Sequence, residues 1–200
     1  MSIATTSAGR RDEAFRSLRS SIKFSAGETP VRSVLIVDAD RKDASDSAEQ
    51  VARAFAKAGD SCAFVDGNFR TGGTSTPGFS DLLIGSHPLD SVLQGNTGDG
   101  LLTTIGAGTV ADPDLLAGDQ VTRALEALLQ RFEYVILSTA SLPQYSDAIS
   151  LASRVDATLL VVSSGKTRRP RAVEARDALE RVGARVLGVV LIEAKRRLFW

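Results

Sequence analysis

The chain alternates short, wholly apolar runs with stretches whose apolar residues recur every three or four positions. The apolar runs are rich in β-branched residues, which is typical of strands that are buried on both faces of a parallel sheet. The predicted strands are 33–37, 62–65, 134–137, 157–162 and 185–192.

Between these runs, apolar side chains follow the period of an amphipathic helix. The apolar stripes lie within 48–58, 121–129 and 172–182, and Gly59 and Gly183 stand where carboxy-terminal helix caps belong. Because strands and helices alternate, the pattern predicts a doubly wound α/β fold with a mostly parallel sheet and helices on both faces.

The composition is that of an ordinary globular domain. The 200 residues are 43% hydrophobic and 24% charged, and 24 basic residues balance 24 acidic ones. This balance provides no basic field that would attract nucleic acid, so we expect no nucleic-acid partner. The single cysteine, Cys62, and the lack of a signal peptide or a membrane-length apolar run predict a cytoplasmic protein. Such a protein would reach the inner face of the plasma membrane through a partner.

Function is expected at the carboxyl ends of the strands, where ligands bind in open α/β sheets. Three segments leave that edge, after Val37, Val65 and Leu137. The first of them runs from a strand through a loop into a helix, which is the frame that holds phosphate in many nucleotide-binding proteins.

The loop after Val37 lacks what a phosphate cradle needs. A P-loop supplies glycines for close backbone approach, a lysine and a hydroxyl. Counted back from Gly59, the helix places Asp43, Ala44 and Ser45 where Gly-Lys-Ser would stand, so the hydroxyl alone is kept. A carboxylate about 5 Å from a phosphate charge costs roughly 3 kcal/mol at an effective dielectric of about 20. The sequence therefore predicts that phosphate does not bind at this loop.

The carboxylates of the loop have a structural and a chemical interpretation. Asp46 and Glu49 have the spacing of a capping box, so helix capping is the favoured interpretation. The alternative is an acidic metal-binding switch built from Asp38, Asp40 and Asp66. A response-regulator receiver with Asp66 as phosphoacceptor is disfavoured, because this residue follows the second strand rather than the third.

A series of short motifs extends in order from about Glu13 to Ala194. They are EAFRSLRSSIKF (13–24), SVLIV with VARAFAKAGDSCAFVDGNFR, GFSDLLIG (78–85), DPDLLA (112–117), FEYVIL (132–137), SDAISLASRVDATLLVV (146–162), GKTRR (165–169) and VGARVLGVVL (182–191). In this order they resemble the cytoplasmic bacterial tyrosine kinases (BY-kinases) of capsule and exopolysaccharide export, which belong to the MinD/ParA-like deviant P-loop class. The resemblance implies a P-loop NTPase-like fold.

The sequence differs from this family at the positions that, by the resemblance, would bind magnesium and nucleotide and accept the proton in catalysis. The family's second motif is D-x-D-x-R, and here Asp66 and Arg70 remain while Asn68 replaces the second aspartate. An amide cannot accept a proton as a carboxylate does. Ser138 replaces the aspartate of the magnesium shell, and Ile192 replaces the asparagine that contacts the base. The carboxy-terminal tyrosine cluster is also missing, since the chain holds 2 tyrosines in all.

We therefore interpret the chain as a non-catalytic, pseudokinase-type scaffold or regulatory domain in exopolysaccharide or capsule biosynthesis, with no cofactor and no metal. Its vestigial pocket is expected to be empty or filled by side chains that bind one another, with Asp66 paired to Arg70 or Arg41. The opposed hypothesis is an atypical ATP-binding kinase or ATPase, which the retained Ser45, Asp66 and Arg70 motivate.

Three parts of the chain are distinguished. Residues 1–30 are predicted to form an amino-terminal arm and oligomerisation helix, 31–194 the degenerate P-loop NTPase-like domain, and 195–200 a basic and aromatic tail. The tail could contact an anionic membrane surface or a partner's groove, but a frayed, solvated end is the favoured interpretation.

Glu13, Arg16 and Arg19 are spaced three residues apart and share one face of the predicted amino-terminal helix. The resemblance implies that this motif is the family's subunit-contact helix, so we expect these residues at a protein interface. The expected partners are a second copy of the chain, an active tyrosine-kinase homologue, or a membrane polysaccharide co-polymerase that determines chain length.

Overall fold

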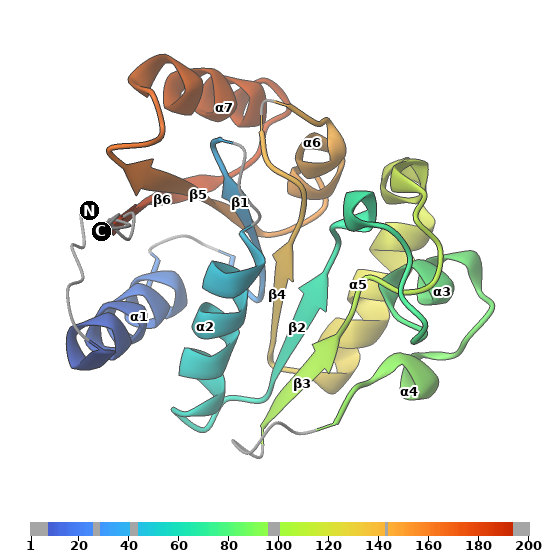
Figure 1. The fold of residues 1–200 in the computed structure, drawn as a ribbon. Helices are drawn as coiled ribbons and strands as arrows, with labels where there is room; N and C mark the ends of the chain where they lie inside the picture. Colours follow the sequence, from blue (N-terminus) through green and yellow to red (C-terminus); the bar gives the residue numbers. More distant parts are fainter. Residues whose placement is uncertain (1–7, 26–28, 41–43, 96–100, 143, 194–200) are drawn as a thin grey trace, which may run out of the picture.

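The computed structural model describes residues 8–25, 29–40, 44–95, 101–142 and 144–193 (Figure 1). Strands and helices alternate through most of this length. In chain order the elements are α1 (Ala8–Lys23), β1 (Ser33–Asp38), α2 (Ser45–Ala56), β2 (Cys62–Asp66), the 3-10 helix η1 (Phe69–Thr71), α3 (Phe79–Ile84), α4 (Leu89–Val92), β3 (Leu102–Ile105), the 3-10 helix η2 (Pro113–Ala117), α5 (Gln120–Arg131), β4 (Tyr134–Ser138), α6 (Asp147–Ala152), β5 (Ala157–Ser164), α7 (Arg169–Arg181) and β6 (Val186–Glu193).

The six strands form one sheet in the order β3-β2-β4-β1-β5-β6, and every named pair of neighbours is parallel. All five predicted strands form, and β3 adds a sixth strand within the Gly-rich stretch between Gly67 and Gly118. β1 is buried at all six positions, as its apolar run predicts for a strand that is covered on both faces.

Helices cover both faces of the sheet (Figure 1). One apolar core joins the sheet to α1 and α2, and a second core joins the other face to α3, α5, α6 and α7. The predicted doubly wound α/β fold is therefore confirmed.

α2 shows how the apolar stripe positions the loop that precedes it. Ala48, Val51 and Phe55 are almost completely buried, and the small alanine lets the helix axis approach the sheet. The ring of Phe55 packs against Tyr134 of β4 with 4.2 Å between centroids. Gly59 ends this unit at φ 94°, a left-handed conformation that glycine adopts without steric cost.

A buried carboxylate ties α3 to the loop after β3. Asp81 accepts hydrogen bonds from the backbone N–H groups of Gly78 and Thr109, both at 2.8 Å, and from the Thr109 hydroxyl. Burial disfavours the charged form, but these hydrogen bonds together outweigh burial and lower the pKa of Asp81 below its ordinary value. A polar clamp thus joins two parts of the Gly-rich stretch, α3 and the loop after β3, in addition to apolar packing.

Two helices differ from the sequence-based expectation. α1 begins at Ala8, before the motif that starts at Glu13. α6 has six residues, fewer than two turns, so its apolar periodicity is too short to predict it. The boundary predicted between the arm and the α/β domain stays a prediction, and the tail 195–200 lies outside the described residues.

Within the described part of the chain, we find no helix with both the length and the apolar character needed to cross a bilayer.

Candidate functional site

Three strand ends meet at the edge where the sequence places the site. β4 lies between β2 and β1, and these strands end at Ser138, Asp66 and Asp38, respectively. Asp66 and Ser138 are directly paired in the parallel register of β2 and β4. Gly67 follows, and a Cβ added there would lie 2.8 Å from the carbonyl oxygen of Ser138. The glycine therefore allows the two strand ends to stay close together.

The hydroxyl and carboxylate groups at this edge bind one another. The Oγ atoms of Ser45 and Ser138 are 3.1 Å apart, and the Ser138 hydroxyl donates to Asp66 Oδ1 at 3.2 Å. The same Asp66 oxygen accepts the backbone N–H of Asn68 at 2.9 Å. The structure thus brings together Ser45, Asp66 and Ser138, which the sequence assigns to one vestigial pocket.

Asn68 has a local structural role. Its side-chain oxygen accepts the backbone N–H of Arg70 at 3.3 Å and caps η1. This is the arrangement in which asparagine commonly starts a turn or short helix. Where a second carboxylate would stand in a D-x-D-x-R motif, the side-chain oxygen supports the backbone instead.

Arg70 does not bind Asp66 as expected. Its Nε and one terminal nitrogen bind the two carboxylate oxygens of Asp147, each at 2.7 Å, and its guanidinium lies 4.2 Å from the Tyr145 ring centroid. The hydrogen bonds to Asp147 raise the pKa of Arg70. The expected pairing is wrong because η1 carries Arg70 toward the start of α6 and away from the end of β2. The other expected partner, Arg41, lies outside the described residues.

Asp147 is the residue at this edge that the sequence interpretation missed. Its side chain is 3% exposed, and it is the first residue of α6. An acidic residue in a first helical turn is a helix-start signal, and Ser146-Asp147 after an apolar strand carries that signal. The signal predicts the helix start, but it does not name the arginine that binds the carboxylate.

The start of α2 differs from the predicted capping box. The helix begins at Ser45 with Ala44 as its N-cap residue, so Asp46 lies inside the first turn. Glu49 binds Arg53 at 2.7 Å instead of reaching back to cap a backbone N–H. Asp43 lies outside the described residues.

The alternative acidic metal site is not assembled. Asp38 is 3% exposed and its Oδ1 accepts the backbone N–H of Asp40, while Asp66 binds Ser138 and Asn68. Across the part of the chain that the structure describes, no three His, Cys, Asp or Glu side chains form a group that could hold a metal ion.

The amino-terminal motif divides into an exposed part and an attached part. Glu13 and Arg16 form an ion pair at 2.9 Å, and both side chains are more than 60% exposed. Arg19 lies 3.6 Å from Asp60, which also binds Lys23 at 2.6 Å. The hydrogen bond to Asp60 raises the pKa of Lys23. Arg19 and Lys23 thus attach α1 to the turn before β2, whereas Glu13 and Arg16 face solvent.

No family model matches the chain. Individual curated proteins do match it over most of its length. It is 26% identical to the putative tyrosine-protein kinase CapB of Staphylococcus aureus over 90% of this chain and 82% of CapB. It is 28% identical to the tyrosine-protein kinase CpsD of Streptococcus pneumoniae over 90% of this chain and 83% of CpsD.

Solved structures of tyrosine-kinase domains are similar to this chain as well. The kinase domain of the Escherichia coli tyrosine kinase ETK superposes with a TM-score of 0.82 at 25% identity, covering 94% of this chain and 78% of that one. The chimerical protein CapA2B2 gives a TM-score of 0.84 at 24% identity, over 96% and 92%. MinD from the Aquifex aeolicus MinC:MinD complex shares the fold at a TM-score of 0.64 and 15% identity, over 80% and 68%. Together, the relatives and the structural neighbours support the identification of this chain as a BY-kinase domain of the P-loop class.

Proposed function

We propose that this BY-kinase domain is non-catalytic and acts by protein association in bacterial capsule or exopolysaccharide biosynthesis. The observation that carries the proposal is the hydrogen-bonded chain Ser45–Ser138–Asp66 at the strand edge. In a kinase, this position needs carboxylates for magnesium and for the proton of the attacking hydroxyl. Here two hydroxyls stand beside the one carboxylate, and they bind one another.

The loop before α2 supports the same conclusion through electrostatics. The lysine that would attract phosphate is replaced by Ala44, and Asp43 adds a negative charge. The loss of the lysine removes an attraction of roughly 3 kcal/mol, and the aspartate adds a repulsion of roughly the same size. Together they weaken the free energy of nucleotide binding by about 6 kcal/mol before screening by salt. Such a change lowers nucleotide affinity by about four orders of magnitude.

Calorimetry and thermal unfolding with ATP and magnesium test this proposal. We expect no saturable heat and no rise in unfolding temperature, while an active relative's kinase domain in the same buffer responds to both. Stabilisation that saturates at micromolar ATP would overturn the proposal, because a ligand that binds the native state must stabilise it. It would favour the alternative, an atypical ATP-binding tyrosine kinase or ATPase.

We place the association surface on the exposed part of α1. Glu13 and Arg16 are solvent-exposed and bind each other, so their charges are available to a partner at little structural cost. The partner would be a second copy, an active kinase homologue or a membrane chain-length determinant, which would hold the domain at the inner membrane face. The chimerical nature of the CapA2B2 neighbour supports a domain that works with a partner.

Light scattering after size exclusion tests self-association on α1. Glu13→Ala/Arg16→Ala should reduce the mass toward that of a monomer. The matched control is Arg171→Ala/Glu174→Ala, which removes an exposed pair of the same spacing on α7 and should leave the mass unchanged. Identical monomeric masses for the wild type and both variants would reject self-association, and co-purification with an active homologue would then test the remaining partners.

A further inference from the structure

Four exposed cations lie where β5 ends and α7 begins. They are Lys166, Arg168, Arg169 and Arg171. The stretch 163–173 contains no carboxylate. Within the described residues, Arg171 pairs with Glu174 at 3.3 Å, whereas the other three cations make no ion pair. This edge of the sheet therefore presents positive charge to solvent, although 24 basic residues balance 24 acidic ones in the whole chain.

The turn that carries these cations is held by its own hydrogen bonds. The hydroxyl of Thr167 accepts the backbone N–H of Ser163 at 3.0 Å, and the backbone N–H of Thr167 donates to the carbonyl oxygen of Ser163 at 2.9 Å. α7 then starts with Pro170 in its first turn, a position that suits proline because its missing N–H would have no partner in the helix. The cations thus project from a compact turn that is fixed to the end of β5.

The end of β6 brings a second basic segment to the same place. Ser164 of β5 and Glu193 of β6 are paired in the parallel register, so the two strands end side by side (Figure 1). Residues 194–200 lie outside the described residues, and their sequence is AKRRLFW, three cations followed by three apolar residues. The two segments together hold 7 of the chain's 24 basic residues, four after β5 and three after β6.

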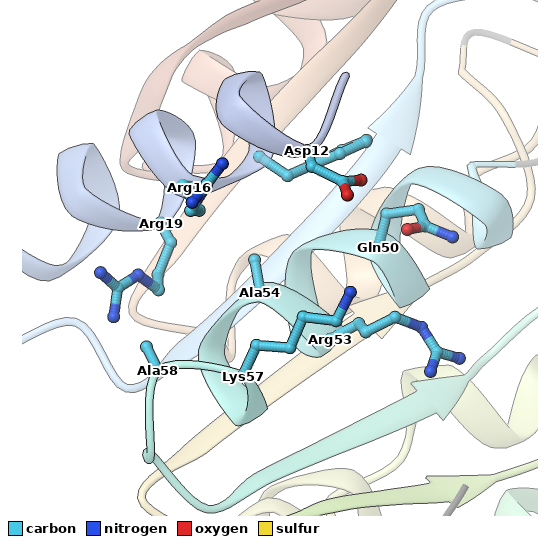
Figure 2. A pocket seen from close by; sticks show the side chains of 9 residues that line it. Asp12, Arg16, Arg19, Gln50, Arg53, Ala54, Lys57 and Ala58 are labelled. Carbon is cyan, nitrogen blue, oxygen red and sulfur yellow. The ribbon is translucent and has the colours of Figure 1, made fainter. Parts of the chain in front are cut away.

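The cations between α1 and α2 differ, because carboxylates lie close to them. They surround a cavity of about 340 Å³ (Figure 2). Of its lining residues, Arg16, Arg19 and Arg53 each pair with a carboxylate, and Asp12 offsets the charge of Lys57. That surface is therefore close to neutral, whereas the ends of β5 and β6 keep an excess of positive charge.

We propose that the segments that follow β5 and β6 form one surface that binds the anionic headgroups of a lipid bilayer. Each lysine or arginine near an anionic membrane strengthens binding about fivefold. Tryptophan and phenylalanine favour the interface between headgroups and acyl chains. A bilayer is favoured over an acidic protein segment because it provides a place for the apolar end of the tail as well as for the cations.

The pairing of Ser164 with Glu193 is what changes the interpretation of the tail. The sequence alone favours a solvated end, but the register shows that the tail starts beside four further cations. The inference goes beyond a domain that a partner holds at the membrane, because it adds a direct contact with lipid. It depends neither on the loss of catalysis nor on the α1 surface.

Vesicle flotation of the 200-residue chain tests the proposal. We expect the protein to float with vesicles in which phosphatidylglycerol replaces about a third of the phosphatidylcholine, and not with phosphatidylcholine alone. Raising the salt from about 0.1 M to about 1 M shortens the screening length from about 10 Å to about 3 Å and should release the protein. Trp200 is the single tryptophan, so its fluorescence emission should move to shorter wavelength when anionic vesicles are added.

Substitutions on the described part of the surface give the quantitative test. Arg168→Gln/Arg169→Gln should weaken binding to the anionic vesicles about 25-fold, and Lys166→Gln about fivefold. All three side chains are exposed, so these variants should fold. The matched control is Arg176→Gln/Arg181→Gln, which removes two cations from the same helix. Arg181 lies about 18 Å along α7 from its start, beyond the screening length, so the control should weaken binding less than about threefold.

Four results would overturn the proposal. The first is no flotation with anionic vesicles at low salt. The second is equal flotation with neutral vesicles, which would exclude recognition of charge. The third is equal weakening by the control, which would indicate a general charge effect. The fourth is binding of poly-glutamate, but not of vesicles, that depends on Arg168 and Arg169, which would assign the surface to an acidic protein. All variants keep Glu13 and Arg16, so these results are independent of the association and ATP tests.

Discussion

The ion pair between Arg70 and Asp147 is expected to stabilise the domain, and removing Arg70 alone is expected to cost more than removing both partners. The Asp147 side chain is 3% exposed and receives two hydrogen bonds of 2.7 Å, so Arg70→Ala leaves a buried carboxylate without its cation. Such a loss costs about 3–5 kcal/mol for a fully buried pair. The Arg70 side chain is 34% exposed and water can partly replace it, so we discount the cost to about 2–3 kcal/mol.

The companion substitutions give a full double-mutant cycle. Asp147→Ala is expected to cost about 1–2 kcal/mol, because the freed guanidinium can turn toward water. The double variant should lose about 2 kcal/mol, less than the sum of about 3–5 kcal/mol for the single losses, which gives a coupling energy of about 1–3 kcal/mol. For a chain of this length, Arg70→Ala should lower the unfolding temperature by about 5–10 °C.

Urea unfolding followed by circular dichroism measures each corner of the cycle. Arg176→Ala is the control, since its ion pair with Asp177 on α7 is half-exposed and should contribute nothing measurable. Additive losses in the double variant, or a loss for Arg70→Ala no larger than for Arg176→Ala, would refute a structural role for the Arg70–Asp147 pair.

Four further outcomes follow from other parts of the fold. Asp81→Asn should cost about 2 kcal/mol, because one of the two buried acceptor oxygens becomes an NH2 donor and the charge that strengthens the hydrogen bonds from the N–H groups is lost. The pKa of Asp81 is lowered in the folded protein, so the stabilisation of the fold by its ionised carboxylate is complete at neutral pH. This stabilisation is lost as the pH falls through the unfolded and then the folded pKa, so Asp81→Asn should lose less stability on acidification than the wild type. Gly78→Ala should cost about 2–3 kcal/mol, because the added Cβ would lie 2.3 Å from a backbone oxygen of the facing loop. Asp60→Asn should speed hydrogen exchange in α1, because Lys23 loses its carboxylate. Cys62 should not react with a thiol reagent until the protein unfolds, because burial raises the pKa of its thiol.

Matched controls separate these effects from general destabilisation. Asp119→Asn changes an exposed aspartate that makes no helix-cap hydrogen bond, and should leave stability unchanged. Gly188→Ala adds a Cβ that meets no atom within 4 Å. If either control costs as much as its counterpart at Asp81 or Gly78, the clamp between α3 and the loop after β3 does not stabilise the fold as described. Rapid labelling of Cys62 in the folded protein would contradict its complete burial.

The fold was predictable because strands that are buried on both faces of a parallel sheet appear in the sequence as continuous apolar runs. Runs such as 33–37 and 157–162 are apolar throughout, and the helices between them keep a regular period. The meeting of Ser45, Asp66 and Ser138 followed from the rule that parallel strands end at one edge of a sheet.

The side-chain pairs at the site were not predictable in the same way. Arg70 and Asp147 are 77 positions apart, and their contact depends on how η1 and α6 are placed relative to each other. The roles within the α1 motif also depend on docking. Helical spacing puts Arg16 and Arg19 on one side of α1, but Arg19 pairs with Asp60 in the turn before β2, whereas Arg16 stays exposed to solvent. No local pattern in the sequence specifies that distinction.

The contact between Ser138 and Asp66 also bears on what the family's aspartate would do if it were placed at position 138. Ser138→Asp alone would place a second carboxylate beside Asp66, where the hydroxyl now donates a hydrogen bond at 3.2 Å. Two carboxylates at that separation resist ionising together unless a cation lies between them. Under the proposed non-catalytic function, Ser138→Asp alone would therefore destabilise the strand edge, and substitutions in the loop before α2 that attract a magnesium nucleotide would be needed with it.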